Sequence, residues 1–270
     1  MESLPPLLFD PRRRAAMRRR SLARGADRAF LLQHIATELS DRLAIVTRDF
    51  ANVLVIGPVA MLADQILMGR KGDVVHAPLA DEDLLPFSPG QFDLVLSAGT
   101  LDSVNDLPGA LIQLRRILAP DGLLLATLYG AGSLATLKSA LLEADGDRTR
   151  AHIHPQIDVK AMADLMTRAG FALPVCDGER LEVRYASWRR LVDDLRDAGA
   201  GNILAGDRRY DRSLPQRLER AWAARADPDG RLRENIQFLH ISGWAPAPTQ
   251  PKPARRGSGQ ISLTDLFGRP

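Results

Sequence analysis

The residues between positions 55 and 61 are of a kind that could hold a nucleotide-like cofactor. They read Val-Ile-Gly-Pro-Val-Ala-Met and follow an apolar, β-branched run from Asn52 to Ile56. A glycine between a buried strand and a helix lets the backbone approach a ligand, and the helix N-terminus attracts negative charge. Loops of this kind usually carry several glycines, whereas here Gly57 stands alone. Taken by itself, the segment is therefore better interpreted as an ordinary turn packed with side chains.

A second candidate lies where another strand ends, at Ser97 and Asp102. The run from Phe92 to Ser97 is the clearest buried strand in the chain. In open sheets of parallel strands, ligands bind outside the carboxyl ends of the strands. We therefore assign Ser97 and Asp102, together with Gly57, to one predicted cofactor site. The sequence identifies no catalytic residue.

Three other residues could carry chemistry. His152 and His154 are two positions apart, so they could lie on one face of a strand and ligate a metal with a carboxylate. A loop with hydrogen-bonded histidines is the favoured interpretation. Cys176 is the only cysteine, which excludes an internal disulfide and a four-thiolate metal site. It lies at the end of an apolar strand and is predicted to be buried rather than nucleophilic.

These candidates need a framework of strands alternating with helices. Apolar β-branched runs predict strands, and apolar residues at helical spacing predict helices. Buried strands that alternate with helices indicate a mostly parallel sheet with helices on both faces. The predicted strands are 52–56, 73–76, 92–97, 123–128, 171–175, 180–185 and 235–244, and the predicted helices are 28–46, 59–68, 107–118, 133–143, 159–169, 188–198 and 214–224. We expect Ser133 to begin its helix.

The composition and charge define the domain organisation. The 270 residues are 45% hydrophobic and 26% charged, which suits one α/β domain with modest extensions. Residues 1–28 hold eight arginines against three acidic residues. A nucleic-acid arm, a transit peptide and a basic helix lying on the domain all remain open; the last is favoured because no aromatic residue is interleaved for stacking. We divide the chain into a basic helical segment (1–48), an α/β domain (49–244) and a Pro- and Arg-rich tail (245–270).

Short motifs in order along the chain resemble class I S-adenosylmethionine (SAM)-dependent methyltransferases. The segments 80–87, 92–95, 104–108 and 120–122, which read ADEDLLPF, FDLV, VNDLP and PDG, resemble those of the type that includes the malonyl-carrier-protein methyltransferase of the biotin pathway. The segments 152–155, 168–171, 193–195, 199–202, 242–244 and 255–258 resemble the complex I assembly factor 5 family over nearly the whole chain.

The resemblance implies a Rossmann-like fold that binds SAM. In that family the loop after the first strand carries an acidic residue followed by three glycines, and Gly57 matches the first glycine. Asp81 matches the acid that contacts the adenine amino group, with Glu82 beside it. Three positions depart from the pattern, because they carry Val55 in place of the acid and Val59 and Met61 in place of the other glycines.

A further departure is one of length. Only 29 positions separate Asn52 from Asp81, which is room for a single strand–helix–strand unit of about 30 residues. We therefore predict that the second strand and its helix are missing. In relatives that strand ends in the acid that binds the ribose hydroxyls, and Asp73 lies at the wrong end to replace it.

The resemblance leaves two functions open. One is a SAM-dependent methyltransferase, or an enzyme of the family's hydroxylase type, acting on a protein linked to respiratory complex I. The other is a non-catalytic assembly factor that has lost SAM binding and works by binding a partner. We expect no nucleic-acid partner and no membrane span, and the composition points to a bacterial cytoplasmic protein. The sequence does not predict an oligomeric state.

Overall fold

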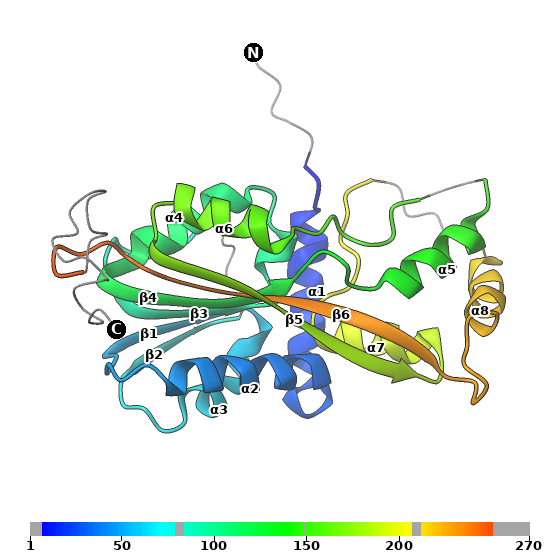
Figure 1. The fold of residues 1–270 in the computed structure, drawn as a ribbon, viewed down its shortest axis with the longest axis horizontal. Coiled ribbons are helices and arrows are strands. Elements are labelled where there is room, and N and C mark those ends of the chain that lie inside the picture. The colour runs from blue at the N-terminus through cyan, green and yellow to red at the C-terminus, as the bar shows by residue number, and fades with distance from the viewer. Residues whose placement is uncertain (1–6, 79–83, 148–149, 207–211, 251–270) are drawn as a thin grey trace, which may run out of the picture.

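The computed structural model describes residues 7–78, 84–147, 150–206 and 212–250 of the chain. The predicted α/β architecture is confirmed (Figure 1). The helices are α1 (Pro11–Arg24), α2 (Phe30–Ala44), α3 (Ala63–Leu67), α4 (Leu107–Ile117), α5 (Ala135–Asp145), α6 (Val159–Arg168), α7 (Trp188–Asp197) and α8 (Leu214–Ala223), with short 3-10 turns η1 (Ala26–Arg28), η2 (Pro58–Leu62) and η3 (Leu101–Ser103). The strands are β1 (Asn52–Ile56), β2 (Asp73–Ala77), β3 (Phe92–Ala98), β4 (Leu118–Tyr129), β5 (Ala172–Tyr185) and β6 (Leu232–Trp244).

The six strands form one mixed sheet in the order β2-β1-β3-β4-β6-β5. The first four pair in parallel, while β6 pairs antiparallel with both β4 and β5. Helices α4 and α6 cover one face, and α2 and α3 cover the other (Figure 1). Each face has its own core cluster: Val53 and Val55 point into one, and Leu54 and Ile56 into the other. Burial on both faces explains the continuous apolar strands.

Strand β2 corrects the predicted position of the missing unit. It pairs in parallel with β1, from Asn52 with Asp73 to Ile56 with Ala77. It therefore occupies the place next to β1, where a second strand belongs. Doubly wound sheets normally continue with a third strand beyond the second, but β2 is the sheet edge within the part of the chain that the structure describes. The absent strand is the outer one, because a single short crossover returns the chain to the neighbouring position.

Several predicted boundaries are wrong. The helix expected at 59–68 is split into η2 and α3 and ends at Met68, which has a left-handed φ of 47°. Helix α5 begins at Ala135 rather than at Ser133, whose hydroxyl donates to the Gln237 carbonyl. The strands expected at 171–175 and 180–185 are one strand, β5, because the polar residues between them also pair with β6.

The basic N-terminal helix α1 lies on the domain, as the favoured interpretation predicted. Asp10 caps it by accepting hydrogen bonds from the first-turn backbone N–H groups. Arg14 and Arg18 are buried. Arg24 pairs with the buried carboxylate of Asp197 at 2.6 Å, and the Ser21 hydroxyl donates to the Asp197 carbonyl at 2.6 Å. These contacts join α1 to the C-terminal end of α7. In the described residues no helix is both long and apolar enough to cross a membrane.

Candidate functional site

The loop at Gly57 is closed by the protein itself. Gly57 has φ +86°, and a Cβ placed there would lie 2.2 Å from Thr100 Cγ2 and 2.8 Å from the Ala98 carbonyl oxygen. Its own N–H donates to the Ala77 carbonyl. The glycine is therefore needed so that the loop after β1 can approach the end of β3. The space beside its Cα, which a ligand would need, holds a threonine.

Side chains also fill the turn that follows. Pro58, Val59 and Ala60 are all buried, and Val59 belongs to the core cluster beneath α2. Helices α1 and α2 contact η2, and Gly199 after α7 packs against Pro58. The backbone of a helix start suits an anion only where its N–H groups are accessible. The residues at this loop do not fit the amino-acid end of SAM.

The other predicted cofactor residues separate into three groups. Ser97 is fully buried and shares a hydrogen bond of 2.8 Å with the Thr100 hydroxyl, so it supports the loop. Asp102, in η3, lines a large cavity. Asp81 and Glu82 lie outside the described residues.

This cavity, of about 760 Å³, lies between α1, α5, α7 and α8. Asp102 and Tyr129 open onto it from the carboxyl ends of β3 and β4, where parallel sheets place ligands. Its volume is that of a small-molecule site. Most of its lining is apolar, from Met17, Leu134, Leu137, Leu141, Trp188, Val192, Leu195, Leu214 and Leu218. Neither Gly57 nor Ser97 is part of the lining.

One wall of the cavity is positively charged. Arg13, Met17, Arg20 and Arg24 line it, and their spacing places them on one face of α1. Arg13 donates to the carbonyls of residues 204 and 206, and Arg24 pairs with the Asp197 carboxylate at the end of α7. Arg20 is exposed and makes no hydrogen bond or ion pair with any described residue. Among the lining residues that the structure describes, Asp102 is the only carboxylate.

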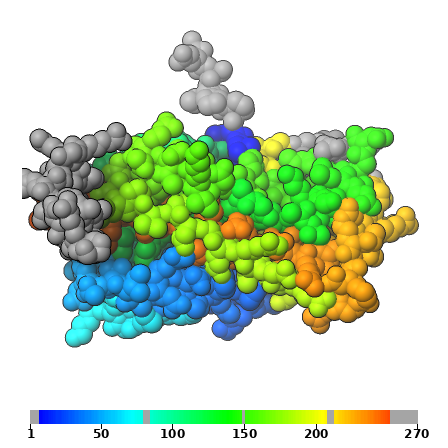
Figure 2. Space-filling model, viewed as in Figure 1, coloured from blue at the N-terminus to red at the C-terminus, as the bar shows by residue number. Residues whose placement is uncertain are grey.

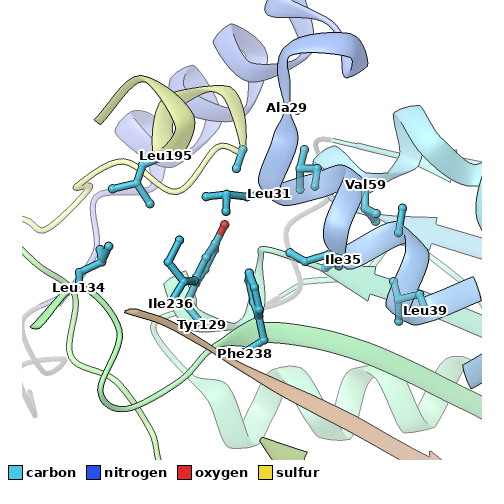
Figure 3. Packing of buried hydrophobic residues seen from close by; sticks show 14 of the residues in the cluster. Ala29, Leu31, Ile35, Leu39, Val59, Tyr129, Leu134, Leu195, Ile236 and Phe238 are labelled. Carbon is cyan, nitrogen blue, oxygen red and sulfur yellow. The ribbon is translucent and has the colours of Figure 1, made fainter. Parts of the chain in front are cut away.

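Tyr129, which lines the cavity, carries an unsatisfied hydroxyl. Figure 3 shows its ring beside Phe238, with the oxygen pointing away from the sheet towards Leu31. The hydroxyl is buried and has no hydrogen-bond partner among the described residues. Burial, and secondarily the negative charge of Asp102, raise the pKa of Tyr129. The phenol therefore stays protonated and is an unpaired donor in the core beside the cavity.

Replacing Tyr129 with phenylalanine tests this. A buried polar group without a partner costs about 1–3 kcal/mol, so we expect Tyr129→Phe to leave the unligated protein equally stable or to stabilise it by about 1 kcal/mol. Urea unfolding followed by circular dichroism measures the change. Phe238→Leu, in the adjacent ring, is the control and should destabilise by packing loss alone. A loss of more than about 1 kcal/mol in Tyr129→Phe would show that the hydroxyl is already paired.

The two loop histidines contact different partners. His152 contacts Asp145 at 2.8 Å, while the ring of His154 accepts from the Ile203 N–H at 3.0 Å and packs against Phe9. The favoured interpretation of hydrogen-bonded histidines agrees with these contacts. Cys176 is only half-buried, and this burial raises its pKa to about 11. A thiol with that pKa is a poor nucleophile at neutral pH.

Sequence reasoning missed most of the cavity. Tyr129 directly follows the strand predicted at 123–128, in a loop that the family resemblance places beside the substrate cleft, and Arg20 belongs to the basic segment. The spacing 13, 17, 20, 24 was the available signal, since it is the one-face pattern of a helix. The apolar residues on α5, α7 and α8 looked like ordinary core positions, and most of them are also buried.

Comparison with known proteins now defines the class. A sequence model described as a methyltransferase domain matches residues 10–174. The fold resembles a methyltransferase-type crystal structure from Bacillus halodurans C-125, with a TM-score of 0.52 and 12% identity, over 78% of this chain and 99% of that one. The chain belongs to the class I SAM-dependent methyltransferase superfamily.

Relatives of two kinds match at higher identity. The mitochondrial arginine-hydroxylase NDUFAF5 of Danio rerio is 30% identical over 254 residues, which cover 90% of this chain and 73% of the relative. The human protein of the same name is 29% identical over 88% of this chain and 76% of its own. The malonyl-[acyl-carrier protein] O-methyltransferase of Laribacter hongkongensis is 35% identical over 62% of this chain and 56% of its own.

Proposed function

We propose that this methyltransferase-family protein is a partner-binding factor that receives an acidic group of another protein in its cavity, without SAM at the Gly57 loop. The observation that carries the proposal is the contrast between the two halves of the site. The cavity at the ends of β3 and β4 is large, whereas the loop after β1 is packed with Pro58, Val59 and Thr100. The cavity can therefore bind a group of a partner, whereas the packed loop after β1 has no space for the SAM that would donate a methyl group.

The charge of the cavity supports an acidic rather than a basic partner group. Among the described lining residues, arginines of α1 and α7 and Arg212 outnumber the one carboxylate, that of Asp102. Three of these arginines already pair with carboxylates outside the cavity, so Arg20 supplies the unpaired charge on α1. An arginine side chain, which the name of the NDUFAF5 relatives implies as substrate, would meet like charges there. A carboxylate, as in the malonyl group named for the other relatives, would meet opposite ones. As partner we propose a subunit of respiratory complex I, in line with the motif resemblance.

A second candidate is SAM-dependent methyl transfer. Its support is membership in the superfamily and the position of Asp102, which lines the cavity beside the end of β3. Transfer from SAM needs in-line placement more than acid–base groups. Cofactor binding would then have to use contacts other than those at Gly57.

Two titrations separate these candidates. Calorimetry of the full-length protein with SAM and with S-adenosylhomocysteine should show no heat at high micromolar ligand. Separately purified hydrophilic subunits of complex I should be titrated by fluorescence anisotropy, and one of them should bind. Saturable heat with SAM would overturn the cofactor-free proposal, and failure of every subunit to bind would overturn the partner.

Charge reversal at Arg20 is expected to weaken partner binding at least tenfold. The substitution Arg20→Glu places a negative charge on the cationic wall, and tenfold corresponds to about 1.4 kcal/mol. Arg19→Glu is the matched control, because Arg19 is the exposed neighbour on α1 that does not line the cavity. Anisotropy at low and high salt measures both. Equal weakening by the two variants would show that the overall charge of α1, not the cavity, binds the partner.

A further inference from the structure

We propose that His34, Glu38 and Glu179 form a binding site for a divalent transition-metal ion. His34 and Glu38 are four residues apart on α2 and so share a helix face; Glu179 lies on β5. Each side chain offers one ligand atom, and the three atoms lie within 4.8 Å of one another. Within the described residues, no other three His, Cys, Asp or Glu side chains meet this closely.

A contact with a second, buried histidine holds the carboxylate of Glu179 in position. Its Oε1 lies 2.8 Å from His34 Nε2, and its Oε2 lies 3.0 Å from Nε2 of the buried His240. His240 in turn contacts the Thr127 hydroxyl through Nδ1 at 2.9 Å. A histidine that is itself oriented and hydrogen-bonded to a ligating carboxylate is the usual outer support of a metal site. This chain from β4 through β6 orients Glu179 towards α2.

The local charge favours a cation. The guanidinium of Arg42 contacts the carboxylates of Glu38 and Asp177, and Glu179 adds a third carboxylate beside Glu38. Arg42 lies 2.8 Å from Asp177 but 3.8 Å from Glu38, so it mainly neutralises the residue outside the proposed ligand set. The two remaining negative charges match one divalent ion.

The site is accessible and lies apart from the cavity. The side chains of His34, Glu38 and Glu179 are 22%, 30% and 28% exposed, which leaves room for water as further ligands. In Figure 2 the blue surface of the N-terminal helices borders the yellow-green surface of β5 on this face. None of the three residues lines the cavity. The ion would join α2 to the edge strand of the sheet.

The ligand set indicates the class of metal. One imidazole nitrogen and two carboxylate oxygens suit Zn²⁺, Mn²⁺ or Fe²⁺, because Mg²⁺ and Ca²⁺ prefer oxygen alone. In the structure His34 Nε2 lies 2.8 Å from Glu179 Oε1. Metal binding would replace this contact with two coordinate bonds.

Calorimetric titration of the chelator-treated full-length protein with Zn²⁺ and with Mn²⁺ tests the site. We expect one equivalent to bind and the melting temperature to rise. His34→Ala and Glu179→Gln should each lower the affinity at least tenfold, while Asp41→Asn, an exposed carboxylate on the same helix, should not. Crystals soaked in Zn²⁺ should show an anomalous peak between α2 and β5.

Two results would overturn the proposal. One is the absence of binding by either metal at millimolar concentration. The other is unchanged affinity in His34→Ala, which would place any bound metal elsewhere, for example at the loop histidines. Circular dichroism of each variant establishes that it is folded, so that a loss of binding reports on the ligands.

Discussion

Replacing Gly57 with alanine is expected to destabilise the protein by more than about 4 kcal/mol. The backbone of Gly57 has φ +86° and ψ −177°, a region that is essentially restricted to glycine and costs other residues about 1–3 kcal/mol. The new methyl group would also overlap Thr100 Cγ2 and approach the Ala98 carbonyl. Neither neighbour can move freely, because Thr100 is fully buried and Ala98 belongs to β3. Urea unfolding measures the loss.

Gly25→Ala is the matched control for the free-energy cost of the backbone conformation alone. Gly25 has φ +85° and ψ 159°, close to the values at Gly57, but a Cβ there meets nothing within 4 Å. We expect it to lose about 1–3 kcal/mol. The difference between the two variants isolates the steric contact, and Thr100→Ser in the Gly57→Ala background should recover part of it. Equal losses at the two glycines would mean that the space beside Gly57 is open, and would reinstate the loop as a cofactor cradle.

Replacing Glu234 with alanine is expected to lower the free energy of unfolding by about 3 kcal/mol. Glu234 is fully buried on β6, and its carboxylate accepts from the N–H groups of Thr136, at 3.2 Å, and Leu137, at 2.6 Å. It thereby caps α5 from outside the helix, since Leu134 at the N-cap offers no side-chain acceptor. Removal leaves buried N–H groups unpaired and creates a cavity. Helix α5 also forms the apolar wall of the large cavity, so ligand binding there should weaken too.

The control for Glu234 is Glu182→Ala. Glu182 lies on the neighbouring strand, and among the described residues its partly exposed carboxylate contacts only Arg233, at 3.5 Å. An exposed ion pair of this kind is worth about 0–1 kcal/mol. Urea unfolding of both variants should therefore differ by about 2 kcal/mol or more. Similar losses would show that α5 does not depend on its external cap.

The pH dependence of stability provides a second measurement for Glu234. Burial raises its pKa above the ordinary value of 4.5, although the backbone N–H groups oppose the shift. A carboxyl whose pKa is higher in the folded state binds more protons when folded, so its contribution is greatest below pH 4.5 and falls as the pH rises through the folded pKa. Glu234→Gln lacks this titration. The stability of the wild-type protein relative to Glu234→Gln should thus decline as the pH is raised, and a rise would contradict the direction of the shift.

The sequence by itself determined the class of fold and the order of most elements. Apolar periodicity is a local property, so strands such as β1 and β3 and the helix α4 could be predicted from short segments. Helix starts at Asp106, Asp158 and Ser187 carry their own capping side chains. Val59 and Met61, standing in place of glycines, were also visible in the sequence as a departure within the cofactor loop.

Only the tertiary structure decided what fills that loop and what remains open. Thr100 reaches Gly57 across 43 positions of sequence, and the cap of α5 comes from Glu234, almost 100 positions away. The cavity needs α1, α5, α7 and α8 together, and none of these helices shows it alone. Local patterns indicate which face of an element is buried, but not against which partner. In this protein, contacts between elements far apart in sequence fill the loop at Gly57 and leave open the cavity between α1, α5, α7 and α8.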